Sequence, residues 1–377
     1  MSEQLWIWQH PDWPQFHWDS ERLAPLLREC AKTQGCLLGM SGAAGGNAEL
    51  LESLDTLLQN IITSSAIEGE QLNAASVRSS LARRLGLADE GKPSPRSEGL
   101  AELMMDAIRR HDEPLTLERL FVWHQWLFPT NNNLLANPIR VGQLRGDEPM
   151  QVISGRIDRP TVHFEAPPRA VLQQQMTDFL NWFAVSRDDP NIDPLIRAGI
   201  AHFWFVTLHP FDDGNGRMTR ALTDLALAQG DQQAIRFYAM SVSILDDRSG
   251  YYHILETSQK GTLGITAWLE WFLHTLLRSM EHALLRIERV LAKARFWELH
   301  RADGLLAEQV KVLNRLLDGG ERGFEDGINA AQYQAVAKVS KATATRHLAD
   351  LLSKECLVRL PGGGRSTRYR INWSPST

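Results

Sequence analysis

The chain has 377 residues, 43% of them hydrophobic, and a formal net charge of -5, which is typical of a soluble globular protein of roughly two to three domains. The sequence has neither the run of about 18 apolar residues of a membrane span nor a signal peptide at its start, so we expect a cytoplasmic protein without membrane contact. The three scattered cysteines exclude a disulfide framework and a zinc site. The acidic balance excludes attraction of nucleic acid over the whole surface but leaves room for a local basic patch.

The first 20 residues hold four of the chain's 12 tryptophans, which is too aromatic for a disordered tail. We therefore expect this segment to dock on the body of the protein. A stretch rich in glycine and alanine, residues 39–46, reads as a linker after the first helix.

Helical periodicity dominates the rest of the chain, because apolar residues recur at spacings of three and four. It predicts helices over residues 49–66, 99–110, 117–127, 169–183, 196–208, 218–228 and 265–296. One β-hairpin is predicted over residues 150–164, where two apolar runs flank a turn containing Gly155. The C-terminal residues 356–371 are the other segment with β character.

Residues 209–220, HPFDDGNGRMTR, lie between two predicted helices. Gly214 and Gly216 let the backbone approach a ligand without a Cβ clash. A glycine-bearing loop at a helix N-terminus binds anions, because free N–H groups and the helix dipole point at the ligand. This segment is therefore a candidate phosphate site.

Four side chains of this segment add to that chemistry. Arg217 and Arg220 are three residues apart, so they share a helix face and suit a chain of phosphates. Asp213 offers a carboxylate for Mg²⁺, and His209 could accept a proton near neutral pH. Each feature alone is more often a turn, a solvated face or a loop histidine, and only their ordered combination indicates a Mg²⁺–nucleotide site with a general base.

The segment resembles the motif of the Fic family, HPFxDGNGRxxR, at every specified position. Most members of that family are adenylyltransferases, which move AMP from ATP to a Ser, Thr or Tyr hydroxyl of a protein. The resemblance implies that His209 deprotonates the target hydroxyl and that Asp213 binds Mg²⁺. It further implies phosphate contacts for Asn215 and the backbone of Gly214 and Gly216 (α-phosphate), Arg217 (β-phosphate) and Arg220 (γ-phosphate).

The resemblance extends over roughly residues 50–277. The predicted hairpin stands where the family has a flap that covers the nucleotide and pairs with the target by strand addition, which implies that Ser154 and Gly155 lie near ATP. Tyr251 and Tyr252 stand where the family has its helix beside the adenine and ribose. Core packing of these two tyrosines is an equally good interpretation.

Ser64, Glu68 and Gly69 end a predicted amphipathic helix, with Gly69 in the stop position. Glu68 then lies at the negative end of the helix dipole and needs a cation. The segment resembles the family's inhibitory motif, [S/T]xxxE[G/N], whose N-terminal placement implies a class II protein in which Glu68 pairs with Arg220. A solvated glutamate in the last helical turn is the simpler alternative. In some relatives the same glutamate supports removal of AMP, which leaves reverse activity open here.

The C-terminal part reads as a winged helix. Helices are predicted over residues 330–338 and 341–354, with Ser340 as N-cap, and strands over 358–360 and 369–371 around a wing at 361–364. Between residues 338 and 370, eight basic and two acidic residues leave a local charge of +6. Such a module can bind DNA or a protein.

We thus predict a mainly α protein: a Fic-type helical bundle with a β-hairpin flap, followed by a small α+β winged helix-turn-helix domain. The expected domains are a Trp-rich segment (1–46), a catalytic domain (47–295) and the winged helix (302–377). The predicted function is a self-inhibited adenylyltransferase that uses ATP and Mg²⁺ and modifies a protein target and itself, with a homodimer as one expected state. The alternative is a DNA-binding transcriptional regulator whose Fic core senses nucleotide.

Overall fold

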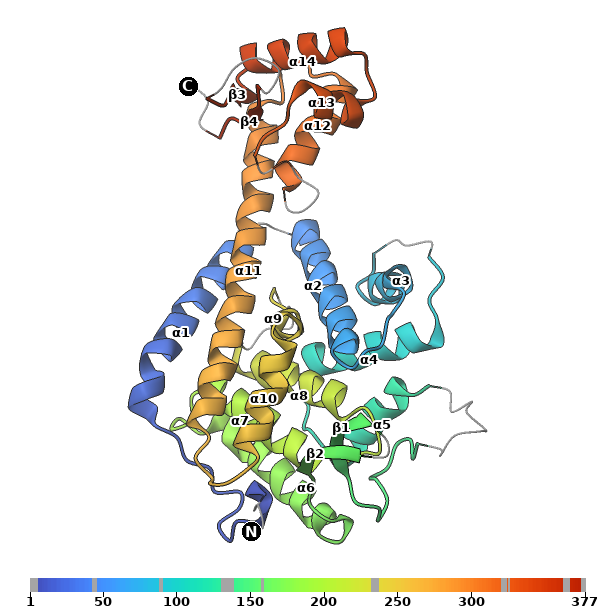
Figure 1. Cartoon of the computed structure of the whole chain (residues 1–377), viewed down its shortest axis with the longest axis vertical. Helices are drawn as coiled ribbons and strands as arrows, with labels where there is room; N and C mark the ends of the chain where they lie inside the picture. The colour runs from blue at the N-terminus through green and yellow to red at the C-terminus, as the bar shows by residue number, and fades with distance from the viewer. Residues whose placement is uncertain are drawn as a thin grey trace. The chain divides into compact units, whose positions relative to one another are not determined.

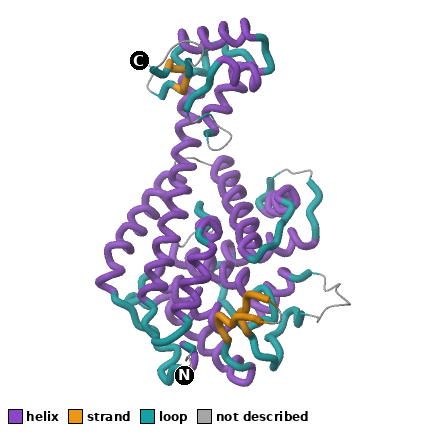
Figure 2. Tube along the Cα trace, in the orientation of Figure 1, coloured by secondary structure: helices purple, strands orange, loops and turns teal. Residues whose placement is uncertain are grey.

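The computed structural model describes residues 6–42, 46–87, 91–129, 139–156, 159–231, 237–319, 324, 326–361 and 367–373. Helices dominate these residues, with two small two-stranded sheets (Figures 1 and 2). The prediction of a mainly α fold is thus confirmed. The chain divides into two compact units, residues 1–283 and 284–377. Within the described ranges, every helix is too short or too polar to cross a membrane.

The first unit is a bundle of helices around α7 and α8, whose connection is the 209–220 segment. Its helices are α1 (Ser20–Gly42), α2 (Gly46–Ile67), α3 (Ala74–Arg84), α4 (Pro95–Arg109), α5 (Leu117–Leu127), α6 (Arg169–Val185), α7 (Pro194–Leu208), α8 (Asn215–Asp231), α9 (Met240–Asp246) and α10 (Arg248–Ser258), with short 3₁₀ helices η1 (Ile7–Gln9) and η2 (Ser186–Asp188). The long helix α11 (Thr266–Leu299) begins in this unit, and its residues from 284 onward belong to the second unit.

The central helix α7 is apolar on every side, as a helix must be when neighbours surround it. Every residue from Leu195 to Leu208 is buried. Gly199 lets α11 approach closely: the Trp268 indole Nε1 donates to the Gly199 carbonyl at 2.9 Å, and a Cβ at Gly199 would meet Leu269 at 2.8 Å. This core fixes the end of α7, where the candidate site begins.

The predicted linker at residues 39–46 is wrong for residues 39–42, which belong to α1, and for Gly46, which begins α2. Residues 43–45 lie outside the described part of the chain. Buried Leu37 and Cys30 pack α1 onto the body, and Cys30 Sγ lies 3.6 Å from the Leu273 carbonyl oxygen. Tertiary packing therefore overrides the weak helix propensity of the glycines.

The predicted hairpin forms from strands β1 (Gln151–Arg156) and β2 (Arg159–Glu165). Gly155 lies inside β1 opposite Pro160, with φ of +91°, so its placement in the turn is corrected. A left-handed φ at a strand residue is tolerated by glycine alone at low cost. Residues 157–158 are not among those described.

The Trp-rich segment docks on the bundle as predicted. The Trp8 indole donates to the Glu165 carbonyl at 2.7 Å, and the Trp6 ring meets the Phe164 ring edge-on at 5.4 Å. The Ile7 N–H donates to the Gln259 carbonyl at 2.9 Å. The segment therefore braces the base of the hairpin and the end of α10 together.

The second unit contains α12 (Ala307–Asp318), α13 (Ala330–Ala337), α14 (Lys341–Ser353), β3 (Leu357–Arg359) and β4 (Tyr369–Ile371). Strands β3 and β4 pair antiparallel, and Ile328 adds a bridge to Tyr369. Ser340 caps α14 by accepting the Thr343 N–H at 3.2 Å, as predicted. Phe296 of α11 belongs to this unit's core, so the compact unit starts earlier in the chain than residue 302. The predicted wing at 361–364 lies outside the described residues, except Pro361.

Candidate active site

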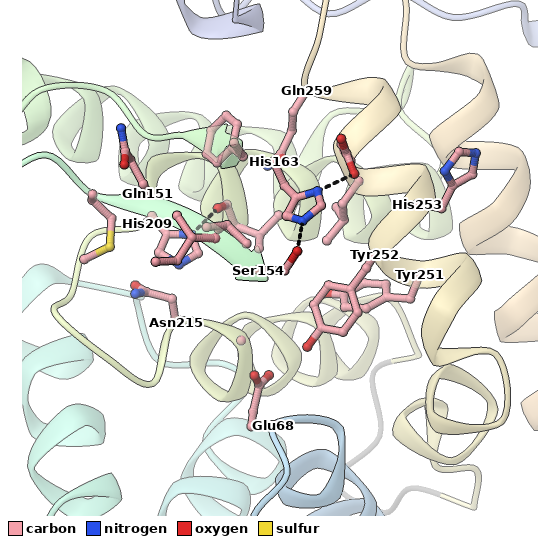
Figure 3. A pocket seen from close by; sticks show the side chains of 18 of the residues that line it. Glu68, Gln151, Ser154, His163, His209, Asn215, Tyr251, Tyr252, His253 and Gln259 are labelled. Carbon is pink, nitrogen blue, oxygen red and sulfur yellow. Dashed lines mark hydrogen bonds and ion pairs between the residues drawn. The ribbon is translucent and has the colours of Figure 1, made fainter. Parts of the chain in front are cut away.

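A cavity of about 770 Å³ lies in the first unit, and most of the predicted site residues line it. Its walls come from the end of α2, the β1–β2 hairpin, the loop between α7 and α8, and α10 (Figure 3). Segments far apart in the sequence thus meet around one space, which is large enough for a nucleotide.

The loop between α7 and α8 begins with a strained residue. His209 ends α7 with φ of 47° in the left-handed region, which is uncommon for a residue with a Cβ. Arg145, 2% exposed, holds this conformation: its Nε donates to the His209 carbonyl at 2.8 Å, and its backbone N–H donates to the Pro210 carbonyl at 2.9 Å. Strain at a site persists where the surroundings over-determine it, and Arg145 is that support.

Two further groups hold the rest of the loop. The Asn215 side-chain amide exchanges hydrogen bonds with the Phe211 backbone, at 2.8 and 3.0 Å. The His124 ring accepts the Gly142 N–H at Nδ1, so its Nε2–H donates to the Asp213 carbonyl at 3.1 Å. These two bonds fix the Asn215 side chain within the loop, and a phosphate here would meet the backbone N–H groups at the start of α8.

His209 is oriented as a general base. Its Nδ1 lies 2.9 Å from the Val206 carbonyl oxygen, which can only accept, so Nδ1 carries the proton and Nε2 carries a lone pair. Burial lowers the pKa of His209 below its ordinary value of 6.5. The imidazole is therefore neutral near pH 7 and able to take a proton at Nε2.

The Glu68 carboxylate lies against Gly216 in the first turn of α8, at the helix end that favours anions. A Cβ at Gly216 would lie 2.1 Å from Oε1 of Glu68, so only glycine admits that carboxylate. At Gly214, φ is +80° and a Cβ would meet the Leu127 side chain at 2.5 Å. Gly216 lets a charged group reach the first turn of α8, where the helix dipole favours anions, and Gly214 lets the loop pack against Leu127.

Glu68 also binds the second arginine of the motif. The Arg220 Nη2 donates to Glu68 Oε1 and to the Ser64 carbonyl, both at 2.8 Å, and its Nε donates to Ser64 Oγ at 2.8 Å. Burial raises the pKa of Glu68, but Arg220 outweighs it and holds that pKa below its ordinary value. Buried Nη1 of Arg220 has no hydrogen-bond partner among the described residues and lies 3.2 Å from the Cβ position of Gly216.

The helix end that carries Glu68 has the expected form. Gly69 adopts φ of +79°, and its N–H donates to the Ala66 carbonyl at 2.9 Å. Arg248 of α10 supplies a second cation, since its Nε donates to the Ile67 carbonyl at 2.6 Å. Arg220 thus offsets the carboxylate at the unfavourable end of the dipole, and Arg248 binds a carbonyl at that same helix end.

The first arginine of the motif is also paired with a carboxylate. Arg217 Nη1 donates to Glu70 Oε2 at 2.5 Å, and Arg96 binds both oxygens of Glu70 at 2.9 and 2.7 Å. Both guanidinium groups lie 5.4 Å from the centre of the Phe128 ring. The two motif arginines therefore face two carboxylates that follow α2, one each.

Asp213 is the freer of the two adjacent aspartates. Arg140 and the Gly146 N–H engage the Asp212 carboxylate, at 3.2 and 3.3 Å. Asp213 is more than half exposed at the cavity wall, where its Oδ1 accepts the Gly214 N–H. Arg217 Nη2 lies 3.9 Å from the same Oδ1. An exposed carboxylate beside a candidate phosphate site fits Mg²⁺, which takes one or two carboxylates with phosphate oxygens.

The remaining predicted residues lie on the hairpin and on α10. Ser154, Tyr251 and Tyr252 line the cavity, and Gly155 follows in β1. Tyr251 is 2% exposed and its hydroxyl lies 3.0 Å from His202 Nε2, so core packing explains it. Tyr252 is only half-buried, which leaves its ring available to a ligand.

Sequence reasoning missed the residues that support the site from elsewhere in the chain: Glu70, Arg96, His124, Arg145, His163 and Glu256. The sequence does contain a signal for Glu70. It is a second carboxylate, two residues after Glu68, and two carboxylates could pair with the two arginines that lie three residues apart. Arg145 and His124 had none, since their partners are backbone atoms far away in the sequence.

Two parts of the chain match known protein families. Residues 114–227 match the model of the Fic/DOC family, and residues 6–87 match a domain of unknown function (DUF4172), which extends beyond the predicted 1–46 segment and includes α2. "Protein adenylyltransferase Fic" of Drosophila mojavensis is 26% identical over 215 residues, which is 55% of this chain and 38% of that protein. "Protein adenylyltransferase fic-1" of Caenorhabditis elegans is 27% identical over 208 residues, 52% of this chain and 36% of that protein.

The chain thus spans less than two fifths of the length of these curated relatives. A crystal structure of a Fic family protein from Desulfovibrio desulfuricans G20 superposes with a TM-score of 0.51 at 20% identity, over 94% of this chain and 97% of that one. A Fic domain containing signaling protein from Bacteroides thetaiotaomicron gives a TM-score of 0.50 at 19% identity, over 68% and 97%. The class is that of helical bundles in which a glycine-bearing loop joins two central helices, here α7 and α8. Residues 114–227 of this chain match the Fic/DOC family model, and the chain has the fold of these solved Fic proteins.

Proposed function

We propose that this protein is a self-inhibited adenylyltransferase, which moves AMP from ATP to a Ser, Thr or Tyr hydroxyl of a target protein. One observation carries the proposal: a glycine-bearing helix N-terminus, suited to phosphate, and a neutral, oriented imidazole line the same cavity. The relatives named protein adenylyltransferase support the choice of AMP as the transferred group.

Each residue then has one task. The Nε2 of His209 takes the proton of the target hydroxyl as that oxygen attacks the α-phosphorus. The backbone N–H groups at the start of α8 stabilise the charge on the α-phosphate, and Arg217 and Arg220 bind the β- and γ-phosphates. Asp213 would hold Mg²⁺, which when bound neutralises phosphate charge. Ser154, Gly155 and Tyr252 border the nucleotide.

Transfer can be tested by the fate of labelled phosphates. The protein is incubated with a bacterial lysate and with ATP labelled at the α- or at the γ-phosphate, in Mg²⁺ buffer. Label in protein bands from α-labelled ATP alone supports AMP transfer. Label from γ-labelled ATP alone would mean phosphoryl transfer and would reject the proposal.

The same proposal includes a brake. Glu68 occupies the first turn of α8 and binds Arg220, and Glu70 binds Arg217. A triphosphate would need the same space at the start of α8 and the same two guanidinium groups, so each carboxylate competes with it for an arginine. Whether Glu68 also places water for AMP removal is tested with the Glu68 variants below.

We expect Glu70→Gln to strengthen ATP binding about two- to fivefold. The side chain is partly exposed, so the competing ion pair contributes on the order of 0.5–1 kcal/mol. Isothermal titration calorimetry of the wild type and of the variant with ATP measures the two dissociation constants. Glu281→Gln, which removes an exposed carboxylate on α11 away from the cavity, is the matched control. An unchanged or weaker affinity in Glu70→Gln would reject competition by Glu70.

A second candidate function is DNA binding by the C-terminal unit, which we propose as a winged helix. The observation that favours it is the exposure of Lys341 and Arg346 on α14, within a segment of predicted charge +6. Lys354, by contrast, is paired with Asp350 at 2.7 Å. A recognition helix with exposed cations suits the phosphate backbone of DNA.

If the C-terminal unit binds DNA, affinity for a labelled duplex falls steeply with salt. Lys341→Ala and Arg346→Ala should each weaken binding and lower the slope of log K against log salt by about 1, as expected for one lost phosphate contact. Fluorescence anisotropy at several salt concentrations measures both effects. Binding to no duplex would instead favour a protein partner for this unit.

A further inference from the structure

Three side chains form a hydrogen-bonded chain on the cavity wall, from the hairpin to α10 (Figure 3). The hydroxyl Oγ of Ser154 lies 2.5 Å from His163 Nε2, and His163 Nδ1 lies 2.9 Å from Glu256 Oε2. A hydroxyl, an imidazole and a carboxylate in this order are the arrangement of an activated nucleophile.

The backbone of the hairpin is built to aim this imidazole. Val152 pairs with Phe164 and Ile153 pairs with Val162, so His163 is the extra residue of a β-bulge in β2. Bulges redirect a side chain that regular alternation would place elsewhere, and they are frequent beside active sites. In regular pairing His163 would have a partner residue of its own on β1.

The carboxylate determines which ring nitrogen carries the proton. Lys260 Nζ lies 2.5 Å from Glu256 Oε1, and this contact holds the pKa of Glu256 below its ordinary value. An ionised carboxylate only accepts hydrogen bonds, so His163 Nδ1–H donates to it. Neutral His163 then has its lone pair at Nε2, facing the Ser154 hydroxyl, which donates to it.

Ser154 lies in the same cavity as the phosphate site. Ser154 and His163 line the cavity that His209, Asn215 and Gly216 also line. We propose that Ser154 is an acceptor for AMP within this chain, with His163 as its own general base and Glu256 as the residue that orients the base. The inference rests on the proposed adenylyl transfer and names the modified residue.

The transfer of AMP to Ser154 is a displacement at the α-phosphorus of ATP. Ser154 Oγ forms a bond to the α-phosphorus of ATP while its proton passes to His163 Nε2. The bond from the α-phosphorus to the bridging oxygen breaks, and pyrophosphate leaves with the electron pair. Glu256 stabilises the imidazolium that results. AMP then remains on the hairpin as a phosphodiester of Ser154.

The test uses the full chain with Glu68→Gly, incubated with Mg²⁺–ATP and a lysate, followed by tryptic peptide mass spectrometry. Cleavage after Arg145 and Arg156 gives peptide 146–156, whose single hydroxyl side chain is Ser154. We expect an AMP adduct on this peptide. Ser154→Ala should abolish the adduct there, whereas Thr161→Ala, which removes the hydroxyl that faces Ser154 across the hairpin, should keep it.

The role of His163 is tested by the ratio of AMP labelling on Ser154 to AMP labelling on lysate proteins. We expect His163→Gln to lower Ser154 labelling, relative to labelling of lysate proteins in the same tube, by at least about 100-fold, the lower end for loss of a general base. His209→Asn should shift the same ratio in the opposite direction. A structural role of His163 that weakens nucleotide binding would lower both labels alike and leave the ratio unchanged.

Three results contradict the inference, and they are distinguishable. AMP on lysate proteins or other residues, with none on peptide 146–156, contradicts Ser154 as acceptor and leaves the proposed function standing. AMP on no protein at all contradicts both. An unchanged ratio in His163→Gln contradicts His163 as the base.

Discussion

Replacement of His209 by asparagine is expected to reduce AMP transfer to target proteins by about 10² to 10⁴, the range for loss of a general base. ATP binding should persist, because the phosphate site consists of the α8 N-terminus and its arginines. Asparagine is chosen because it tolerates the left-handed φ of 47° at this position, whereas alanine adds strain to the loop. Initial rates of label transfer and the Kd for ATP are measured side by side.

His274→Ala is the matched control, since His274 is exposed on α11 away from the cavity. Its transfer rate should equal that of the wild type. If His209→Asn keeps its rate within a factor of about ten of the wild type, well short of the range above, His209 is not the base. Loss of ATP binding together with activity would point to a collapsed loop and not to a missing base.

Glu68→Gly is expected to raise AMP transfer about tenfold to hundredfold. The variant removes a charged competitor for Arg220 that contributes roughly 1.5 to 3 kcal/mol. Arg220→Ala should not reproduce the gain, because the γ-phosphate then loses its own partner. Rates for the wild type, both single variants and the double variant are compared at saturating Mg²⁺–ATP.

Glu68→Gln separates charge from flexibility, because it keeps the length of the side chain at the end of α2. If the ion pair with Arg220 is the brake, Gln and Gly should both activate. Activation by Gly alone would indicate a loosened helix end. A Glu68→Gly rate at or below that of the wild type would contradict the brake. If Glu68 also places water, Glu68→Gly should lose AMP removal from a pre-modified protein.

The centre of the fold could be predicted because it is encoded locally. The apolar stripes locate α5 and α7, and the loop chemistry of residues 209–220 predicts a helix N-terminus with two arginines on one face. Gly69 with φ of +79° was predictable too, since a glycine after an apolar stripe ends a helix. These features depend on spacings within a few residues.

The rest depends on contacts between distant segments. The predicted linker failed because burial of α1 outweighs glycine propensity at residues 39–42. The bulge at His163 is invisible in the sequence, because alternation alone cannot reveal which residue of a strand lacks a partner. The pair of Glu70 with Arg217 spans 147 positions, so no local pattern places the two side chains together.

The most direct test of adenylyl transfer under a carboxylate brake is peptide mass spectrometry of a lysate. It is incubated with Mg²⁺–ATP and either the wild type or the Glu68→Gly protein. Our account predicts AMP adducts on Ser, Thr or Tyr residues that are weak with the wild type and strong with Glu68→Gly. Phosphate adducts in place of AMP, or no adducts with the Glu68→Gly protein, would contradict it.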